Sequence, residues 1–370
     1  MSGRTIGDRD GVRQFPCSRC GAKVEFAPGT DSLECPYCGQ RTAIPAGEAL
    51  IEEQDFLSVT AADLGADGET EEVTSVQCQS CGALVEPSPH HEAFPCPYCG
   101  SSIVTTEKSQ RLIKPQALLS FRIERARATE LFRTWIGRLW FAPNALKKLA
   151  RIDGRLQGLY APYWTYDADT ISRYSGQRGD NYTVTRTRTV VRDGKTVRET
   201  YQAVEIRWRP ASGTVSRDFD DVLVVGSSSL PRDLAEELEP WDLDNLVPYT
   251  DEYLSGFLTE RYQVDVTSGW VRAQERMESV IRQDVQRDIG GDHQRIDSLR
   301  TDHSAVTFKH VLLPMWICSY RYRSEIYRFL VNARTGEVQG QRPWSWVKIT
   351  LTALLVAGVA FVLYTYFEGR

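Results

Sequence analysis

The clearest pattern along this chain is an apolar stretch near its C-terminal end. Residues 349–367 carry no charge and consist mostly of Leu, Ala, Val and Phe. A helix of these nineteen residues is about 28 Å long, which matches the hydrocarbon core of a bilayer. Aromatic residues flank it, as in the interfacial belts of membrane proteins: Trp344, Trp346, Tyr364, Tyr366 and Phe367. The pattern predicts a single-pass transmembrane helix within residues 344–370, rather than the buried helix of a soluble core.

The long central part of the chain, residues 107–343, mixes strand and helix periods without strict alternation. This mixture predicts an α+β body. The expected elements are a strand at 118–123, a helix at 125–140, a mainly helical stretch at 234–288, and strands over 305–338 with a turn at 332–336. In the first helix, Leu131, Trp135 and Leu139 share one face. Residues 270–287 form the clearest helix, which the pair Gly290-Gly291 ends.

Two runs of alternating residues, 182–192 and 196–209, predict a β-hairpin. Asp193-Gly194 joins them, and this dipeptide tolerates the positive φ angles of a type I′ turn. One face of the hairpin carries threonines, and the other carries Arg186 and Arg188. Two interpretations of the arginine face stay open, namely a solvated sheet surface and a surface that binds phosphate or lipid headgroups.

Eight of the nine cysteines form a repeated pattern of C-x-x-C pairs. Each first pair precedes Gly-Ala, and each second pair reads Cys-Pro-Tyr-Cys-Gly, with fourteen residues between the pairs and an offset of 61 residues between the copies. Four thiolates at this spacing are the ligand set of a structural zinc ribbon. The pattern therefore predicts two ribbons that bind two structural Zn²⁺ ions through Cys17, Cys20, Cys35, Cys38, Cys78, Cys81, Cys96 and Cys99.

Two rival interpretations of the cysteines deserve weighing. Cys-Pro-Tyr-Cys is also a redox motif in which a thiolate of low pKa exchanges disulfides, but here neither copy lies in a βαβ pattern. A mixed site with His90 or His91 is the second rival, although four cysteines already fill a tetrahedral shell. The ninth cysteine, Cys318, lies in an apolar strand and is expected to be a buried thiol.

Charge and composition divide the 370 residues into units. The expected units are a polar tail (1–14), a first zinc ribbon (15–45), an acidic linker (46–74), a second ribbon (75–106), the body (107–343) and the membrane helix with its short tail (344–370). The N-terminal tail lacks the apolar run of a secretory signal. Arg334, Arg342 and Lys348 precede the membrane helix, whereas Arg370 alone follows it, so the body is expected on the cytoplasmic side of the inner membrane.

Catalytic motifs do not emerge from the sequence. Gly194-Lys195-Thr196 resembles the end of a phosphate-binding loop, but Thr189 stands where that motif needs Gly. His293, His303 and His310 have no cysteine or carboxylate at motif spacing, and we expect them to be structural or solvated. The chain is therefore interpreted as a protein without enzymatic activity.

The chain resembles a bacterial family of membrane-anchored twin zinc-ribbon proteins. Members are often labelled primosomal protein N-prime (replication factor Y), superfamily II helicase-like or TFIIB-type zinc ribbon-containing proteins. The resemblance is carried by the two Cys-Pro-Tyr-Cys-Gly motifs and by residues 135–146, 158–167, 313–316 and 329–338. It implies membrane-stress machinery, with partners similar to phage-shock protein A or flotillin. The helicase label finds no phosphate-binding loop here.

Three functions follow as hypotheses. The first is a non-enzymatic adaptor or scaffold, which residues 349–367 hold in the bilayer. The alternative is a nucleic-acid-binding ribbon protein, because bases are dense between Arg122 and Arg155. The first ribbon opposes that alternative, because the acids between Cys17 and Cys38, namely Glu25, Asp31 and Glu34, outnumber the two bases there, Arg19 and Lys23. The third is thiol-disulfide exchange, which requires thiols without metal.

Overall fold

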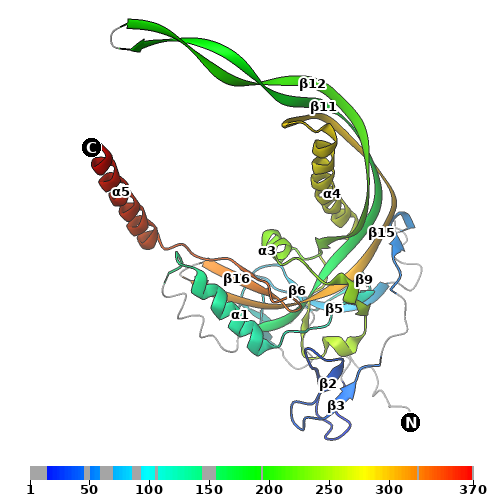
Figure 1. Cartoon of the computed structure of the whole chain (residues 1–370). Coiled ribbons are helices and arrows are strands. Elements are labelled where there is room, and N and C mark those ends of the chain that lie inside the picture. The colour runs from blue at the N-terminus through cyan, green and yellow to red at the C-terminus, as the bar shows by residue number, and fades with distance from the viewer. Residues whose placement is uncertain are drawn as a thin grey trace.

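The computed structural model describes residues 15–45, 51–58, 70–85, 93–104, 107–143, 156–192, 195–322 and 325–368. In these residues, a long curved sheet forms the frame of the molecule, and helices pack on it (Figure 1). Two small cysteine-containing modules lie against one end of the sheet, and helix α5 (Trp346–Glu368) extends from the body by itself. The mixture of helices and sheets agrees with the predicted α+β class.

The central sheet has nine strands, and its main path runs in the order β12-β11-β15-β10-β13. Its frame is three long antiparallel strands, β11 (Gln157–Arg192), β12 (Lys195–Val225) and β15 (His293–Tyr322). Shorter strands complete it: β4 (Gln54–Asp55), β10 (Ala117–Leu118), β13 (Val247–Pro248), β14 (Leu258–Thr259), β16 (Glu325–Asn332) and β17 (Val338–Gly340). Each of the three apolar cores includes residues from the part of β11 that pairs with β15.

The predicted hairpin is confirmed, because Arg192 pairs with Lys195; residues 193–194 lie outside the described ranges. Its strands continue far beyond the predicted ends, since β15 pairs with β11 as far as Gly179 opposite His293. Beyond that point, residues 180–192 and 195–207 continue as a two-stranded ribbon, here called the arm (Figure 1). Thirteen residues per strand at about 3.4 Å each make the arm roughly 44 Å long.

Helix α4 (Val266–Ile289) covers the concave side of the long strands (Figure 1). The clearest predicted helix is thus confirmed, and it starts four residues early because Asp265 caps it and accepts a hydrogen bond from Ser268 N at 2.7 Å. Gly290, with φ of 65°, ends it as predicted. A buried stripe at helical spacing faces the sheet: Val266, Gly269, Ala273, Met277, Ile281, Val285 and Ile289.

Several predicted boundaries were wrong. The stretch 234–288 is mainly helical only at its ends, in α3 (Arg232–Glu237) and α4. Between them lie β13, β14 and the 3₁₀ turns Leu243–Asn245 and Asp251–Leu254. Pro240 and Pro248 prevent a continuous helix there, since proline cannot donate a backbone hydrogen bond. The strand predicted at 118–123 is only β10, at Ala117–Leu118.

Helix α1 (Arg125–Arg138) matches its prediction in position. Its buried stripe is Ala128, Phe132 and Ile136, and Phe132 stacks on Phe329 of β16 with ring centroids 3.5 Å apart. Leu131 and Trp135, which the sequence placed on the apolar face, lie partly buried at the edge of this stripe. The helix therefore closes one side of the sheet, next to β16 and β17.

Part of the acidic stretch predicted to be a linker is ordered against the sheet. In β4, Asp55 pairs with Thr307, and Phe56 of the following 3₁₀ turn (Phe56–Ser58) packs edge-on against Phe308. Strand β5 (Thr70–Gln77) begins inside the same stretch and pairs with β9 (Glu107–Ile113). The chain between the two cysteine modules is thus anchored by Lys309, whose Nζ lies 3.0 Å from Glu53 Oε1.

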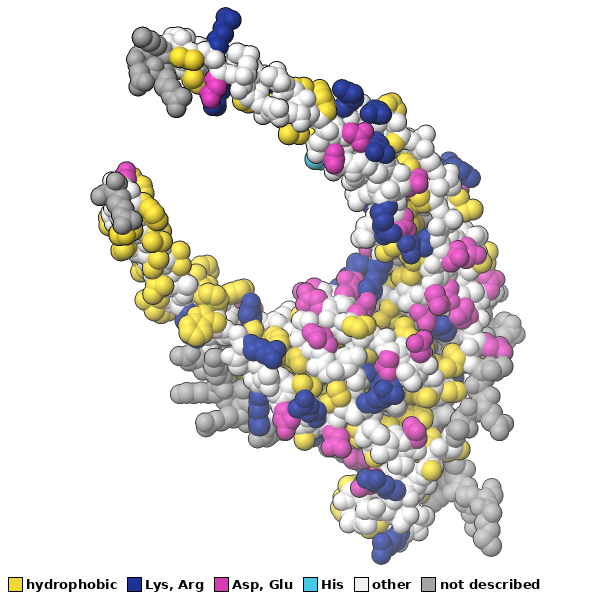
Figure 2. Space-filling view, viewed as in Figure 1, with side chains coloured by type: hydrophobic (Ala, Val, Ile, Leu, Met, Phe, Trp, Pro, Cys, Tyr) yellow, Lys and Arg dark blue, Asp and Glu magenta, His cyan; other side chains and the backbone are white. Residues whose placement is uncertain are grey.

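Helix α5 has 23 residues, an 18-residue window of it has a mean hydropathy of 2.1, and none of its residues is buried. It is the one helix in the described part of the chain that is long and apolar enough to cross a membrane. Apolar side chains cover its visible face (Figure 2). A helix this apolar, which contacts the rest of the described protein only near its start, matches a lipid environment better than water.

Candidate metal centres and their docking on the body

The first cysteine module, residues 15–45, is a small sheet of β1 (Glu25–Phe26), β2 (Ser32–Glu34) and β3 (Arg41–Ala43). Its cysteines lie in two tight turns that close with the same backbone hydrogen bonds. Gly21 N donates to Cys17 O at 2.9 Å, and Gly39 N donates to Cys35 O at 3.0 Å. Both glycines have positive φ, 74° and 69°, which explains why glycine follows each pair.

The second cysteine module, described over residues 75–85 and 93–104, repeats these turns. Gly82 N donates to Cys78 O at 2.7 Å, and Gly100 N donates to Cys96 O at 2.8 Å. Its strands are β6 (Leu84–Val85), β7 (Ala93–Pro95) and β8 (Ser102–Val104), and β6 pairs with the end of β5. The repeat in sequence is therefore a repeat in local structure.

The structure brings all eight predicted cysteine ligands into two groups of four. Within each group the Sγ atoms lie within 4.8 Å of one another. Neighbouring sulfurs are 3.6 Å apart for Cys17 and Cys38, and 3.5 Å apart for Cys20 and Cys35. A tetrahedral ion with metal–sulfur bonds of about 2.3 Å requires sulfurs roughly 3.8 Å apart. Each group therefore fits one metal ion.

Hydrogen bonds within each cluster shift the pKa values of its thiols in different directions, and a metal binds the thiolate form. Hydrogen bonds from the backbone N–H groups of Cys20 and Arg19 lower the pKa of Cys17 to about 6. In the second module, the hydrogen bond from the Cys96 thiol lowers the pKa of Cys81 to about 5. The same hydrogen bond raises the pKa of Cys96, and the pKa of Cys20 is raised to about 12 although a backbone hydrogen bond from Ala22 opposes the shift. Only some of the thiols in each cluster therefore favour the thiolate form.

The two modules dock on the body in different ways. The same tyrosine of the Cys-Pro-Tyr-Cys motif is 82% exposed in the first module, at Tyr37, and fully buried in the second, at Tyr98. The first module instead packs through Val24 and Phe26, whose ring centroid lies 5.1 Å from that of Tyr253. Sequence alone gave no sign of this difference, because the motif is identical in both copies.

Tyr98 ends in a buried polar cluster. Its hydroxyl donates to Glu260, a fully buried carboxyl that also accepts from Ser227 Oγ at 2.8 Å and Gln263 Nε2 at 3.2 Å. Burial raises the pKa of Glu260 to about 7, although these donors oppose the shift. The second module is thus bound to the body by a hydrogen-bonded carboxyl that has no contact with solvent.

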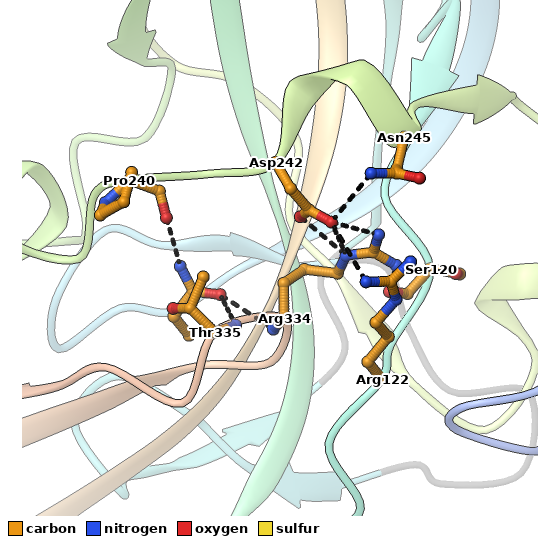
Figure 3. A network of polar contacts seen from close by, with 8 residues as sticks. Ser120, Arg122, Pro240, Asp242, Asn245, Arg334 and Thr335 are labelled. Carbon is orange, nitrogen blue, oxygen red and sulfur yellow. Dashed lines mark hydrogen bonds and ion pairs between the residues drawn. The ribbon is translucent and has the colours of Figure 1, made fainter.

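A second polar network that the sequence did not reveal pins the predicted turn at 332–336 (Figure 3). Arg334, whose side chain is 3% exposed, donates through Nε to Asp242 Oδ1 at 2.8 Å and through Nη1 to Ser120 O at 3.1 Å. Asn332 Nδ2 donates to Leu238 O at 3.0 Å. The charge of Arg334 is therefore neutralised inside the body, so it does not count among the bases that flank α5.

The remaining predicted site residues play structural parts. Cys318 is buried in the core opposite Phe329, as predicted. His310 is fully buried, which lowers its pKa to about 3, and its Nδ1 lies 3.0 Å from Ile113 O. His303 is half-buried beside Trp270, and His293 is exposed with Nε2 3.1 Å from Asn181 Oδ1. These three histidines lie apart from both cysteine groups.

In one further acidic group, carboxylate oxygens of Asp167, Asp220 and Asp221 lie within 4.8 Å of one another. The ammonium group of Lys309 forms an ion pair with this group, because its Nζ lies 2.8 Å from Asp221 Oδ1. Burial and a hydrogen bond to Glu53 raise the pKa of Asp167 to about 7. The group is therefore an internal ion-pair cluster that fastens β4 to the sheet.

Fold and site together define an α+β protein with two four-cysteine clusters and one apolar C-terminal helix. The chain is 25% identical over 356 residues to the uncharacterized protein YdjG of Bacillus subtilis (strain 168). That similarity covers 95% of this chain and 96% of the relative. No family model matches the chain. No solved structure matches it.

The contrast between the two tyrosines yields a test with a built-in control. Tyr98→Phe is expected to lower the free energy of unfolding by about 1–3 kcal/mol, because the buried Glu260 loses one of its three donors. Tyr37→Phe, the same change at the matching position, is expected to change it by less than about 0.5 kcal/mol. Thermal or urea unfolding of the metal-loaded full chain measures both. Equal effects of the two substitutions would contradict the docking role of Tyr98.

Proposed function

We propose that this chain is a non-enzymatic adaptor anchored in the inner membrane by α5, with its body and two zinc ribbons in the cytoplasm. The observation that carries the proposal is α5 itself, which is apolar on every face and buried nowhere. Two of the three bases that precede the apolar run, Arg342 and Lys348, lie close to the start of α5. Positive charge at one end of a membrane helix favours the cytoplasmic side for that end.

Zinc is the metal that we propose for both clusters. Four thiolates with tetrahedral spacing suit Zn²⁺, and the paired glycine turns are those of zinc ribbons. Four protein ligands leave no position for a water or a substrate, so each ion would stabilise its module rather than catalyse a reaction. A cytoplasmic location also suits eight cysteines that must stay reduced.

The arm supports a binding role. Val204 and Ile206 lie on one face of it, with Trp208 at its base, and all three are exposed. The arginines on the other face are already neutralised, since Arg188 Nη2 lies 3.0 Å from Glu199 Oε2 and Arg186 pairs with Glu205. These pairs favour the solvated interpretation of that face over a phosphate-binding one. An exposed apolar strip on a projecting ribbon suits a protein partner.

The partner that we propose is a membrane-stress protein similar to phage-shock protein A or flotillin, as the resemblance to the twin zinc-ribbon family implies. Nucleic-acid binding is the alternative. Several bases of the run after the second module are engaged within the protein, which weakens that alternative. Arg122 lies 3.6 Å from Asp242, Arg127 lies 2.9 Å from Glu130, and Arg125 lies over the ring of Trp316.

A variant of the arm tests the adaptor role. Ile206→Glu in the full chain is expected to abolish recovery of the phage-shock-A-like or flotillin-like partner from solubilised membranes, because a charge replaces the apolar contact. Thr185→Glu adds the same charge to the same face of the arm, where the residue is polar, and is expected to retain the partner. Both variants should keep the metal and the membrane fraction. Tight binding of nucleic acid at physiological salt, with no partner recovered, would favour the alternative.

A further inference from the structure

The start of α5 is tied to the loop that follows α1, residues 139–143. Lys348 Nζ donates to Trp140 O at 3.1 Å and to Ala142 O at 2.8 Å. Ser345 N donates to Phe141 O at 2.8 Å. The first turn of the apolar helix and this loop, about 200 residues apart in sequence, therefore form one hydrogen-bonded unit.

This unit exposes three tryptophans. Trp140 is 71% exposed, although Leu139 and Ala142 on either side of it are buried. Trp344 and Trp346 are 52% and 75% exposed. The ring of Phe141 lies 6.4 Å from that of Trp344, which bridges the loop to the helix start. Indole rings are the side chains most enriched where a membrane protein passes from lipid to water.

The charged side chains nearest the three tryptophans along the chain are all basic. Within residues 131–143 and 338–350, the charged side chains are Arg133, Arg138, Arg342 and Lys348, all of them basic. Arg342 lies over the ring of Trp344, 4.4 Å from its centroid. Dark blue Lys and Arg side chains gather near the base of α5 in the space-filling view (Figure 2). Basic side chains beside exposed indoles match the anionic headgroup layer of a cytoplasmic leaflet.

We infer that the loop at residues 139–143 is a second membrane contact, in which Trp140 enters the headgroup layer and Arg138 and Arg342 bind anionic lipid phosphates. The inference rests on the proposed anchoring by α5 and adds to it. A single helix on a flexible connection would let the body swing freely. Because Lys348 and Ser345 fasten the loop to α5, insertion of Trp140 fixes the α1 side of the body against the bilayer.

Fluorine NMR of the full chain tests this contact. The protein is labelled with 5-fluorotryptophan and placed in nanodiscs of phosphatidylcholine and phosphatidylglycerol that carry a nitroxide on some headgroups. Single Trp→Phe variants assign the signals. The signals of Trp140, Trp344 and Trp346 are expected to be lost through paramagnetic broadening, whereas Trp208 on the arm and the buried Trp164 keep theirs. Discs of phosphatidylcholine alone should restore part of the Trp140 signal.

The outcomes separate the inference from the proposed function. If Trp346 also keeps its signal, α5 does not enter the bilayer and the anchoring itself is wrong. If Trp346 is broadened while Trp140 is not, α5 is anchored but the loop is not a lipid contact, and its tryptophan faces water or another protein. Broadening of Trp140 that does not depend on phosphatidylglycerol would overturn the binding of anionic phosphates by Arg138 and Arg342.

Discussion

Replacing Cys96 by Ser is expected to remove one of two zinc ions per chain and to unfold part of the body with it. The metal supplies most of the folding energy of such a module, about 10–16 kcal/mol in zinc-finger peptides. Tyr98 lies two residues from Cys96, and loss of the module would expose Tyr98 and Leu119 of the same core and remove one of the three donors of Glu260. Elemental analysis and thermal unfolding of the purified full chain measure both effects.

Cys35→Ser is the matched control at the same position of the first module. It is expected to remove one ion as well, but the first module places no buried polar side chain like Tyr98 in the body, so the body should remain folded. Fewer than one zinc ion in a carefully reduced wild-type preparation would refute the metal assignment. Equal unfolding in both variants would leave the metal assignment intact and refute the difference in docking.

Removal of the chain after Arg342 is expected to move the protein from the membrane fraction to the soluble fraction without loss of zinc. All of α5 is then absent, and the loop contact at Trp140 is too small to hold the body alone, since stable anchoring takes more than one weak signal. In the full chain, Val356→Arg near the centre of α5 should weaken insertion by about 2.5–3.5 kcal/mol. Fractionation with antibody detection measures the distribution.

The orientation is read separately from the fractionation. In intact spheroplasts an added protease should spare the modules and the body, because the proposal places both inside. Digestion of the first module before the membrane is broken would refute the cytoplasmic orientation. A truncated chain that stays in the membrane fraction at high salt would show that α5 is not the anchor.

The sequence by itself determined the features whose physics is local. Eight cysteines at fixed spacing, each pair followed by glycine, specified both metal clusters, because the turn, the sulfurs and the positive φ lie within five residues of one another. The uncharged run at 349–367 specified a helix long and apolar enough to cross a membrane, because length and apolarity are properties of that run alone. The cap of α4 at Gly290 and the arm's hairpin were likewise local signals.

Tertiary structure decided whatever depends on partners far along the chain. Tyr37 and Tyr98 belong to identical motifs, and only Tyr98 is buried in the core of the body, where its hydrogen-bond partner Glu260 lies 162 residues away in sequence. Arg334 looked like a membrane-flanking base until Asp242 neutralised it, and the length of β11 follows from pairing with β12 and β15 rather than from its own pattern. Burial and long-range pairing depend on residues throughout the chain. Local periodicity and spacing therefore do not predict them.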